Sequence, residues 1–384
     1  MGWKTGRKGI ADWCVLLCNR SQKWQRAYER ISDPHQIMSC EKLKANKSKW
    51  LVLMVGMLVV SMSSYAQQRP HYTQYILNNY IINPAVAGIE NYTDIKLSHR
   101  HQWVGLEDAP VTTYLTIHGS IGKEDTRTNP TTFSPEGSNP RGMAYWEEYT
   151  SAKPHHGWGV SIINDNTGPL NRFSAYGTYA YHLGIGPRTS LSGGISVGIT
   201  NNSLNGSKLS FDNPIDPAVA SSNVMNTIKP DVNAGLWLYS SDFFAGVSVM
   251  QILDQGLVFS DQTLTTSTKA YPYFFMTAGY KFYAGEDFSI IPSGVIRYVD
   301  PMPVGVDINV KAQYRDRLWF GGGYRVNDGI SAMVGLNISN IFNIGYAYDY
   351  TTSKLQNYTK GTHEIVLGFM LGNKWGDLCP RNLW

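Results

Sequence analysis

Apolar and polar residues alternate one by one over several long stretches of this chain. Residues 191–199 read LSGGISVGI, and residues 304–312 and 330–338 repeat the same period of two. Successive side chains of a β-strand point to opposite faces, so this pattern predicts strands with one apolar and one polar face. Patterns with the 3.6-residue period of an amphipathic helix are scarce.

The alternating segments are fourteen in number, an even count of the kind that single-chain bacterial barrels have. Most run to roughly 9–11 residues, the length that crosses a bilayer when a strand is tilted. The predicted strands are 92–100, 112–120, 157–164, 173–183, 189–200, 232–240, 243–251, 273–282, 288–299, 304–314, 318–326, 329–338, 342–350 and 362–371.

A soluble β-sandwich also alternates, so a second feature is needed to choose between the two architectures. Aromatic residues crowd the ends of the segments, as at Tyr314, Trp319, Phe320, Phe342 and residues 346–350. Such crowding is typical of the girdles that mark the two membrane interfaces of a barrel. We therefore expect an all-β, antiparallel transmembrane barrel spanning residues 92–371.

The connections between the segments favour the same fold. Every second connection is tight, whereas the opposite set includes the long 201–231, 252–272 and 351–361. Short periplasmic turns and long surface loops are the rule in outer-membrane barrels. The 121–156 connection breaks this rule, and it is interpreted as a partner-binding insert, a plug or a missed pair of strands.

The N-terminal region predicts export. The longest apolar run, residues 50–60, follows four lysines and is shorter than the roughly 20 residues that a membrane helix needs. Small residues at Ser64 and Ala66 complete a signal peptide, with cleavage expected between Ala66 and Gln67.

The predicted signal peptide occupies residues 38–66, because Met38 is a natural start. Residues 1–37 are interpreted as a misassigned start or an extended leader. Residues 67–91 are expected to form a periplasmic or plug segment in or under the barrel. Residues 372–384 are expected to form a C-terminal tail.

Composition adds little that changes this picture. Charged residues make up only 16% of the chain and aromatic residues 12%, a balance that suits strands. The formal net charge of +4 comes partly from the lysine-rich N-terminal region, so it does not indicate nucleic-acid binding. Of the four cysteines only Cys379 would remain after cleavage, which excludes an internal disulfide.

The early part of the predicted mature chain is its most specific region. In order, its motifs are Tyr72-Thr73-Gln74-Tyr75, Asn83-Pro84-Ala85-Val86-Ala87-Gly88, Arg100-His101-Gln102-Trp103-Val104-Gly105 and Ala109-Pro110-Val111-Thr112. Later come Asn164-Asp165, Tyr179-Ala180-Tyr181-His182, Gly345-Tyr346-Ala347-Tyr348-Asp349 and His363-Glu364-Ile365. Each motif is weak alone, but in this order they make the chain resemble the PorP/SprF family of type IX secretion and gliding-motility proteins.

This resemblance implies an outer-membrane protein of the Bacteroidetes type, surrounded by outer-membrane lipid. It also implies that the protein associates with the type IX secretion machinery and with a periplasmic, peptidoglycan-associated partner. The expected cargo is an adhesin-like surface protein that carries a C-terminal sorting domain. A passive channel for small solutes is the alternative, and an enzyme is not expected, since no catalytic residue, cofactor site or metal site is evident.

Seven residues are candidates for partner binding. Asn83 and Pro84 precede the first strand, and they form either a plug or docking element or a fixed entry turn. Arg100, Gln102 and Trp103, with Gly105 and Pro110, lie near the first rim. Arginine and tryptophan are common at binding hot spots, but a girdle tryptophan with a snorkelling arginine explains them equally well.

Three further groups of residues are interpreted as structural. His99 and His101 share a strand face, but no third metal ligand is evident nearby, and His155-His156 is interpreted in the same way. Adjacent strand residues such as His363 and Glu364 point to opposite faces and cannot easily cooperate. Three charged residues are expected to point inward, where they either pair with other charges or line a pore, namely Arg297, Asp307 and Lys311.

Overall fold

The structure is a computed structural model that describes residues 72–123, 151–205, 208, 224–253, 255–257, 268–285, 287–315, 317–338 and 341–372. Contacts divide the chain into two units, Met1–Gln67 and Gln68–Trp384, and every described residue lies in the second. Several predictions therefore fall outside the described residues. These are the leader 1–37, the signal peptide 38–66 with cleavage at Ala66 and Gln67, most of the 121–156 connection, and the tail beyond 372.

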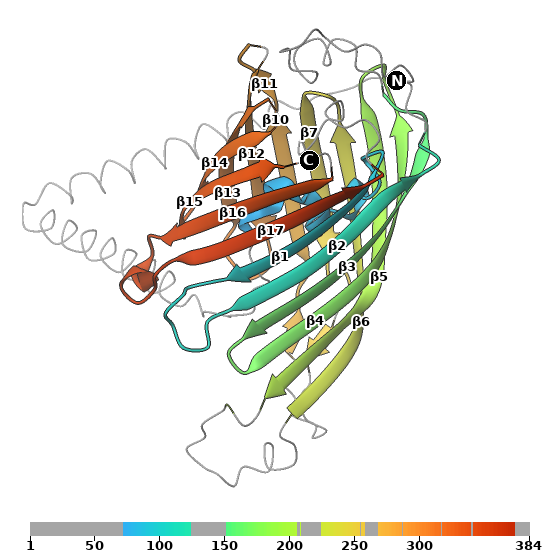
Figure 1. Ribbon diagram of the computed structural model, residues 1–384. Coiled ribbons are helices and arrows are strands. Elements are labelled where there is room, and N and C mark those ends of the chain that lie inside the picture. Colours follow the sequence, from blue (N-terminus) through green and yellow to red (C-terminus); the bar gives the residue numbers. More distant parts are fainter. Residues whose placement is uncertain are drawn as a thin grey trace, which may run out of the picture. The chain divides into compact units, whose positions relative to one another are not determined.

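Fourteen antiparallel strands close into a barrel, as the alternation predicted (Figure 1). They are β1 (Thr93–His101), β2 (Val111–Ile121), β3 (His155–Thr167), β4 (Leu170–Gly184), β5 (Ser190–Asn205), β6 (Val224–Tyr239), β7 (Phe243–Met250), β10 (Tyr273–Tyr280), β12 (Phe288–Tyr298), β13 (Gly305–Tyr314), β14 (Leu318–Arg325), β15 (Gly329–Asn337), β16 (Phe342–Thr351) and β17 (Thr362–Leu371). Each pairs with its neighbours along the chain, and β17 pairs with β1 to close the ring.

Three short strands complete the described sheet structure. The two-residue β11 (Phe282–Tyr283) continues the edge of β10 along β12. β8 (Gln255–Leu257) and β9 (Thr268–Ala270) form a separate hairpin in the connection between β7 and β10. No helix in the described part of the chain is long and apolar enough to cross a bilayer.

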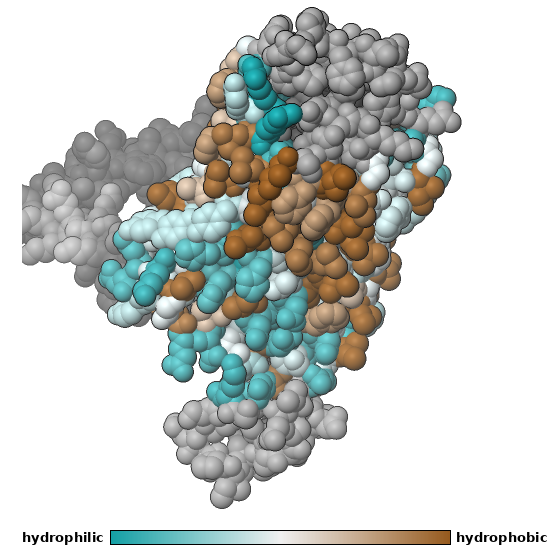
Figure 2. Space-filling model, viewed as in Figure 1, coloured by the Kyte–Doolittle hydropathy of each residue, from teal (hydrophilic) through white to brown (hydrophobic). Residues whose placement is uncertain are grey.

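The outer face of the barrel wall is apolar. On β10, Phe274 and Met276 are 41% and 56% exposed, whereas the alternate residues Phe275 and Thr277 are buried. Figure 2 shows apolar side chains gathered over the part of the wall that contains β1 to β6, with polar side chains toward the end where β3 meets β4. An apolar outer band is what a wall surrounded by hydrocarbon requires.

Aromatic side chains border this apolar band at both ends. At one end Phe288 lies against Tyr314, with ring centroids 4.9 Å apart. At the other end Phe274 lies against Tyr298, with centroids 6.2 Å apart. Rings at these two levels match the aromatic girdles predicted for the membrane interfaces.

Trp319 corrects one detail of that prediction. The sequence placed it in a girdle together with Phe320, but Trp319 is only 1% exposed and points into the lumen. Phe320 is 56% exposed and points outward. Adjacent residues of a strand must face opposite sides, so only one of the two can belong to a girdle.

The two ends of the barrel differ in their connections. At the short-turn end, strands are joined by 185–189, 240–242, 284–287, 315–317 and 338–341. At the long-loop end they are joined by 102–110, 206–223, 251–272 and 352–361, among others. β2 ends and β3 begins at the short-turn end, and the two strands pair directly with each other, so the wall has no further strand between them.

Residues 72–91 fill the lumen, and we call this segment the plug. It consists of three short 3₁₀ turns, η1 (Thr73–Leu77), η2 (Asn79–Ile81) and η3 (Pro84–Val86), and every residue of these turns is buried. Pro84 holds Asn83 in an extended conformation, and Gly88 has a φ of +82°, so the chain turns instead of adding a strand. The plug lies in the barrel rather than under it.

The plug runs along the lumen from the long-loop end to the short-turn end. Thr73 contacts Glu364 near the start of β17, at the long-loop end. Ala87 contacts His182 near the end of β4, at the short-turn end. The described start of the plug therefore lies at the end opposite to the one where β1 begins.

Candidate functional site

Four motif residues that are far apart in the sequence meet where the plug begins. The Arg100 guanidinium lies 2.8 Å from the Asp349 carboxylate and 2.9 Å from the Glu364 carboxylate. It also donates a hydrogen bond to the Thr73 hydroxyl at 2.7 Å, and the Thr73 amide donates to Glu364 at 2.9 Å. We call these four residues the latch, because they tie the plug to β1, β16 and β17.

The latch is a buried ion-pair network. Arg100 is 2% exposed and Glu364 is 1% exposed. A charge removed from water in this way is costly unless it is paired and hydrogen-bonded. One guanidinium faces two carboxylates, and Thr73 supplies the hydroxyl that donates to Asp349 at 2.6 Å, so the plug itself takes part in the network.

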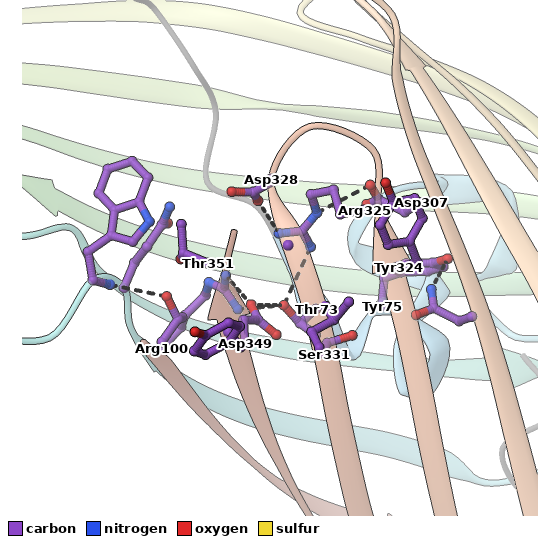
Figure 3. A pocket seen from close by; sticks show the side chains of 17 residues that line it. Thr73, Tyr75, Arg100, Asp307, Tyr324, Arg325, Asp328, Ser331, Asp349 and Thr351 are labelled. Carbon is purple, nitrogen blue, oxygen red and sulfur yellow. Dashed lines mark hydrogen bonds and ion pairs between the residues drawn. The ribbon is translucent and has the colours of Figure 1, made fainter. Parts of the chain in front are cut away.

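A second charged group lies beside the latch in the mouth of the lumen (Figure 3). Arg325 contacts Asp307 at 3.2 Å and Asp328 at 2.9 Å, and in Figure 3 it lies between these two carboxylates. Asp307 and Lys311 are buried and Arg297 is half-buried, which confirms the prediction that these three point inward.

Asn83 holds the middle of the plug against the wall, and Pro84 follows it at the start of the η3 turn. The Asn83 side-chain amide donates to the carbonyls of Leu236 and Val247 at 3.0 and 3.3 Å. Its side-chain oxygen accepts a hydrogen bond from the Ala85 amide at 3.0 Å. Asn83 therefore bridges β6 and β7 and caps the η3 turn, and it is 2% exposed. It is not accessible to a partner while the plug is in place.

Histidines hold the last turn of the plug at the short-turn end. His182 contacts the Ala87 carbonyl at 2.8 Å, and His155 contacts the Gly88 carbonyl at 3.2 Å. The two imidazoles are stacked, with ring centroids 4.5 Å apart. From the sequence, His155 was interpreted as a polar residue of the rim or lumen, and its contact with the plug was not predicted.

Glycines of the wall make room for the plug backbone. A side-chain carbon added at Gly157 would lie 1.9 Å from the Ala87 carbonyl oxygen. One added at Gly194 would lie 2.6 Å from the backbone of Ala85. A glycine inside a strand often marks close approach of another backbone, and this is the signal from which the plug seat could have been found.

The candidate rim residues divide into two groups. Arg100 lies near the long-loop end of β1, as expected for the first rim, but its side chain points into the lumen and belongs to the latch, so it is not a snorkelling residue of the outer face. Gln102, Trp103, Gly105 and Pro110 do lie in the first loop of the long-loop end.

This first loop has a defined conformation. The Gln102 amide donates to the Pro110 carbonyl at 2.9 Å, and the Trp103 amide donates to the Thr362 hydroxyl at 3.1 Å. Trp103 and Gly105 both have positive φ, at 51° and 103°. Binding of a partner by these residues stays a prediction.

The remaining histidine candidates lie on the outside of the wall. His99 and His101 are exposed on the outer face of β1. Among the described residues, no three histidine, cysteine, aspartate or glutamate side chains are grouped so that they could hold a metal ion. As the alternation predicted, His363 and Glu364 face opposite sides, since His363 contacts the outward-facing Tyr346 and Glu364 belongs to the latch.

Similarity to solved structures is low. The chain is similar to the outer membrane protein Omp33 of Acinetobacter baumannii, with 9% identity and a TM-score of 0.41, covering 74% of this chain and 100% of that one. It is similar to the toluene transporter TbuX of Ralstonia pickettii, with 11% identity and a TM-score of 0.44, covering 77% and 92%. A FadL homologue of Pseudomonas aeruginosa gives 9% identity and a TM-score of 0.41, covering 79% and 94%. No curated protein matches the chain.

One family model matches most of the chain. Its description is "Type IX secretion system membrane protein PorP/SprF", and it matches residues 64–369. This span includes the plug, the latch and nearly the whole barrel wall. The barrel is an outer-membrane protein. The chain belongs to the PorP/SprF family of type IX secretion system membrane proteins.

Proposed function

We propose that this barrel supports the secretion, or the anchoring at the cell surface, of proteins that carry a C-terminal sorting domain. It does so as a binding scaffold of the type IX machinery, and neither as a solute channel nor as an enzyme. The observation that carries this proposal is the filled lumen, since the plug 72–91 occupies the path that a solute would take.

Two spaces beside the plug, formed by described residues, are small. The mouth near Arg100 and Arg325 leaves about 20 Å³, and the space near Tyr72 and Arg297 leaves about 30 Å³. A space of this size holds a water molecule or two. A solute would have to displace the plug. The ion pairs of the latch and the close packing of the plug backbone against the wall glycines oppose that displacement. The passive channel is therefore the weaker hypothesis.

At the long-loop end, hydrogen bonds between loops hold loop 102–110 in place. The Val104 amide donates to the Gly361 carbonyl at 2.8 Å, and the Lys360 amide donates to the Val104 carbonyl at 2.7 Å. Lys208 forms an ion pair with Asp108 at 2.8 Å. The two backbone hydrogen bonds tie loop 102–110 to loop 352–361, and the exposed Lys208–Asp108 pair adds a weaker contact. We propose that Gln102, Trp103, Gly105 and Pro110 bind cargo here, and that the periplasmic partner binds the short-turn end.

The test is a gene deletion followed by complementation. The deletion strain would receive an empty vector, the wild-type gene or Trp103→Ala, and the surface and medium proteomes would be compared. We expect the deletion to lose one or a few sorted proteins, the wild-type gene to restore them, and Trp103→Ala to restore them incompletely. Barrel levels in the membrane would be matched by immunoblot.

The remaining outcomes are equally clear. Loss of all sorted proteins would make this barrel a core part of the machine instead of a partner of particular cargo. Unchanged proteomes in the deletion strain would overturn the proposal and favour the channel. Full restoration by Trp103→Ala would remove loop 102–110 from the proposed cargo surface but leave the scaffold role standing.

A further inference from the structure

A large groove crosses the outer face of the wall between β5 and β13. Its free volume is about 580 Å³, far more than the spaces inside the lumen. Its side chains come from the outward-facing positions of these strands and include Leu238, Met276, Ile296 and Ile308. The inward-facing residues that also border it, such as Thr277, have side chains that point into the lumen.

The floor of the groove follows from the strand register. Ala245 of β7 lies opposite Ala278 of β10, and Ala278 lies opposite Gly294 of β12. Leu238 of β6 and Ile308 of β13 continue the same row on either side. Three consecutive small residues are thus flanked by large apolar ones, which leaves a trough in the middle of the row.

The groove lies at the depth of the membrane hydrocarbon. On β10 its residues Met276 and Ala278 are flanked by the outward-facing aromatic residues Phe274 and Tyr280. Phe274 belongs to the girdle at the long-loop end, and Tyr280 packs against Phe282 at the short-turn end. Aromatic girdles mark the two interfaces, so the groove between them faces lipid chains.

Water is a poor occupant of this groove. A trapped water needs two to four polar partners, and here the side chains that reach the groove are apolar. Leaving the groove empty would forfeit the dispersion contacts of its lining. Its occupant is therefore hydrocarbon, and the groove is continuous with the apolar band by which the barrel contacts the membrane.

We propose that the groove binds one acyl chain of a membrane phospholipid as an ordered ligand. Neighbouring strands lie about 4.8 Å apart, so the three small residues of the floor span roughly 10 Å across β7, β10 and β12. A thin, flexible chain can enter a trough of this width between Leu238 and Ile308 and reach the small residues of its floor. The broad convex wall of a second barrel would be stopped by the large residues at its edges.

The experiment uses the full-length barrel in vesicles of phosphatidylethanolamine that contain a small fraction of the same lipid with a photoactivatable acyl chain. We expect the label to concentrate on β7, β10 and β12. Ala278→Leu and, separately, Ala245→Leu fill the trough and should each lose most of this label. Ala332→Leu is the matched control, because Ala332 is an exposed residue on the outer face of β15 outside the groove.

Folding of each variant is checked by its heat-dependent migration in gels. If only one of the two trough variants folds, that variant alone is enough for the test. A label spread evenly around the wall, or one retained in the folded trough variants, would overturn the proposal. Native mass spectrometry of the wild-type barrel should find a bound phospholipid. A lipid-modified protein found in its place would overturn the phospholipid assignment. None of these results affects the proposed cargo role.

Discussion

At the scale of single residues, Arg100 is the residue on which the start of the plug most depends. Arg100→Ala would leave the buried carboxylates of Asp349 and Glu364 without their cation. Breaking a buried pair by removing one partner costs about 3–5 kcal/mol. We expect a clearly lower urea midpoint for unfolding from lipid vesicles.

The control for this variant is Arg315→Ala. Arg315 pairs with Asp287 across two adjacent turns at the short-turn end, with the two charged atoms 3.0 Å apart. Exposed pairs contribute little to stability, so the urea midpoint should stay at the wild-type value. Equal midpoints for Arg100→Ala and Arg315→Ala would show that the latch does not stabilise the barrel.

Gly157 tests the seat of the plug at the same scale. In Gly157→Ala the new methyl group would lie 1.9 Å from the Ala87 carbonyl oxygen, so the plug backbone has to move. Overpacking of this kind costs about 1–3 kcal/mol. We expect faster proteolysis within the plug, measured on folded barrels in vesicles.

Gly177→Ala is the matched control, because the nearest atom to its new methyl group is the Val197 carbonyl oxygen at 3.9 Å. It should show the wild-type rate of plug cleavage. If Gly157→Ala is cut no faster than Gly177→Ala, the plug does not depend on close contact with β3.

At the scale of elements, the strands were predictable and the plug was not. The β5 alternation from Leu191 to Ile199 identified a strand because a wall between lipid and lumen imposes a period of two. Residues 72–91 obey no such period, since the plug is buried on all sides, and only Pro84 and Gly88 signalled an irregular segment. The contact of Arg100 with Glu364 depends on the closing pair β1–β17, which no local pattern encodes.

The outward-facing side of β5 gives a prediction at this scale. Ile195 is 55% exposed in the middle of the apolar band, so Ile195→Arg would place a charge in hydrocarbon. An arginine at the bilayer midplane costs about 2–4 kcal/mol, and one near an interface costs about 0–1 kcal/mol. The urea midpoint for Ile195→Arg should therefore fall well below that for Tyr181→Arg, since Tyr181 lies near the short-turn end. Equal midpoints would contradict the assigned membrane position.

At the scale of the whole molecule, the barrel and the plug form one closed body. The latch, the Asn83 bridge and the histidines bind the plug at both ends and in the middle. This arrangement suits a rigid membrane scaffold that presents loops at one end and turns at the other. Among the described residues, the plug occupies the lumen that a solute would have to cross.

The most direct test of this account is the conductance of the purified barrel in planar lipid bilayers. We expect the wild-type protein to insert without stepwise conductance, because the plug fills the lumen. A variant with residues 72–88 deleted, shown to be folded by its gel migration, should open a stable pore. Stepwise conductance of equal size in the wild-type barrel and in the deletion variant would contradict the closed scaffold and restore the solute channel as the leading function.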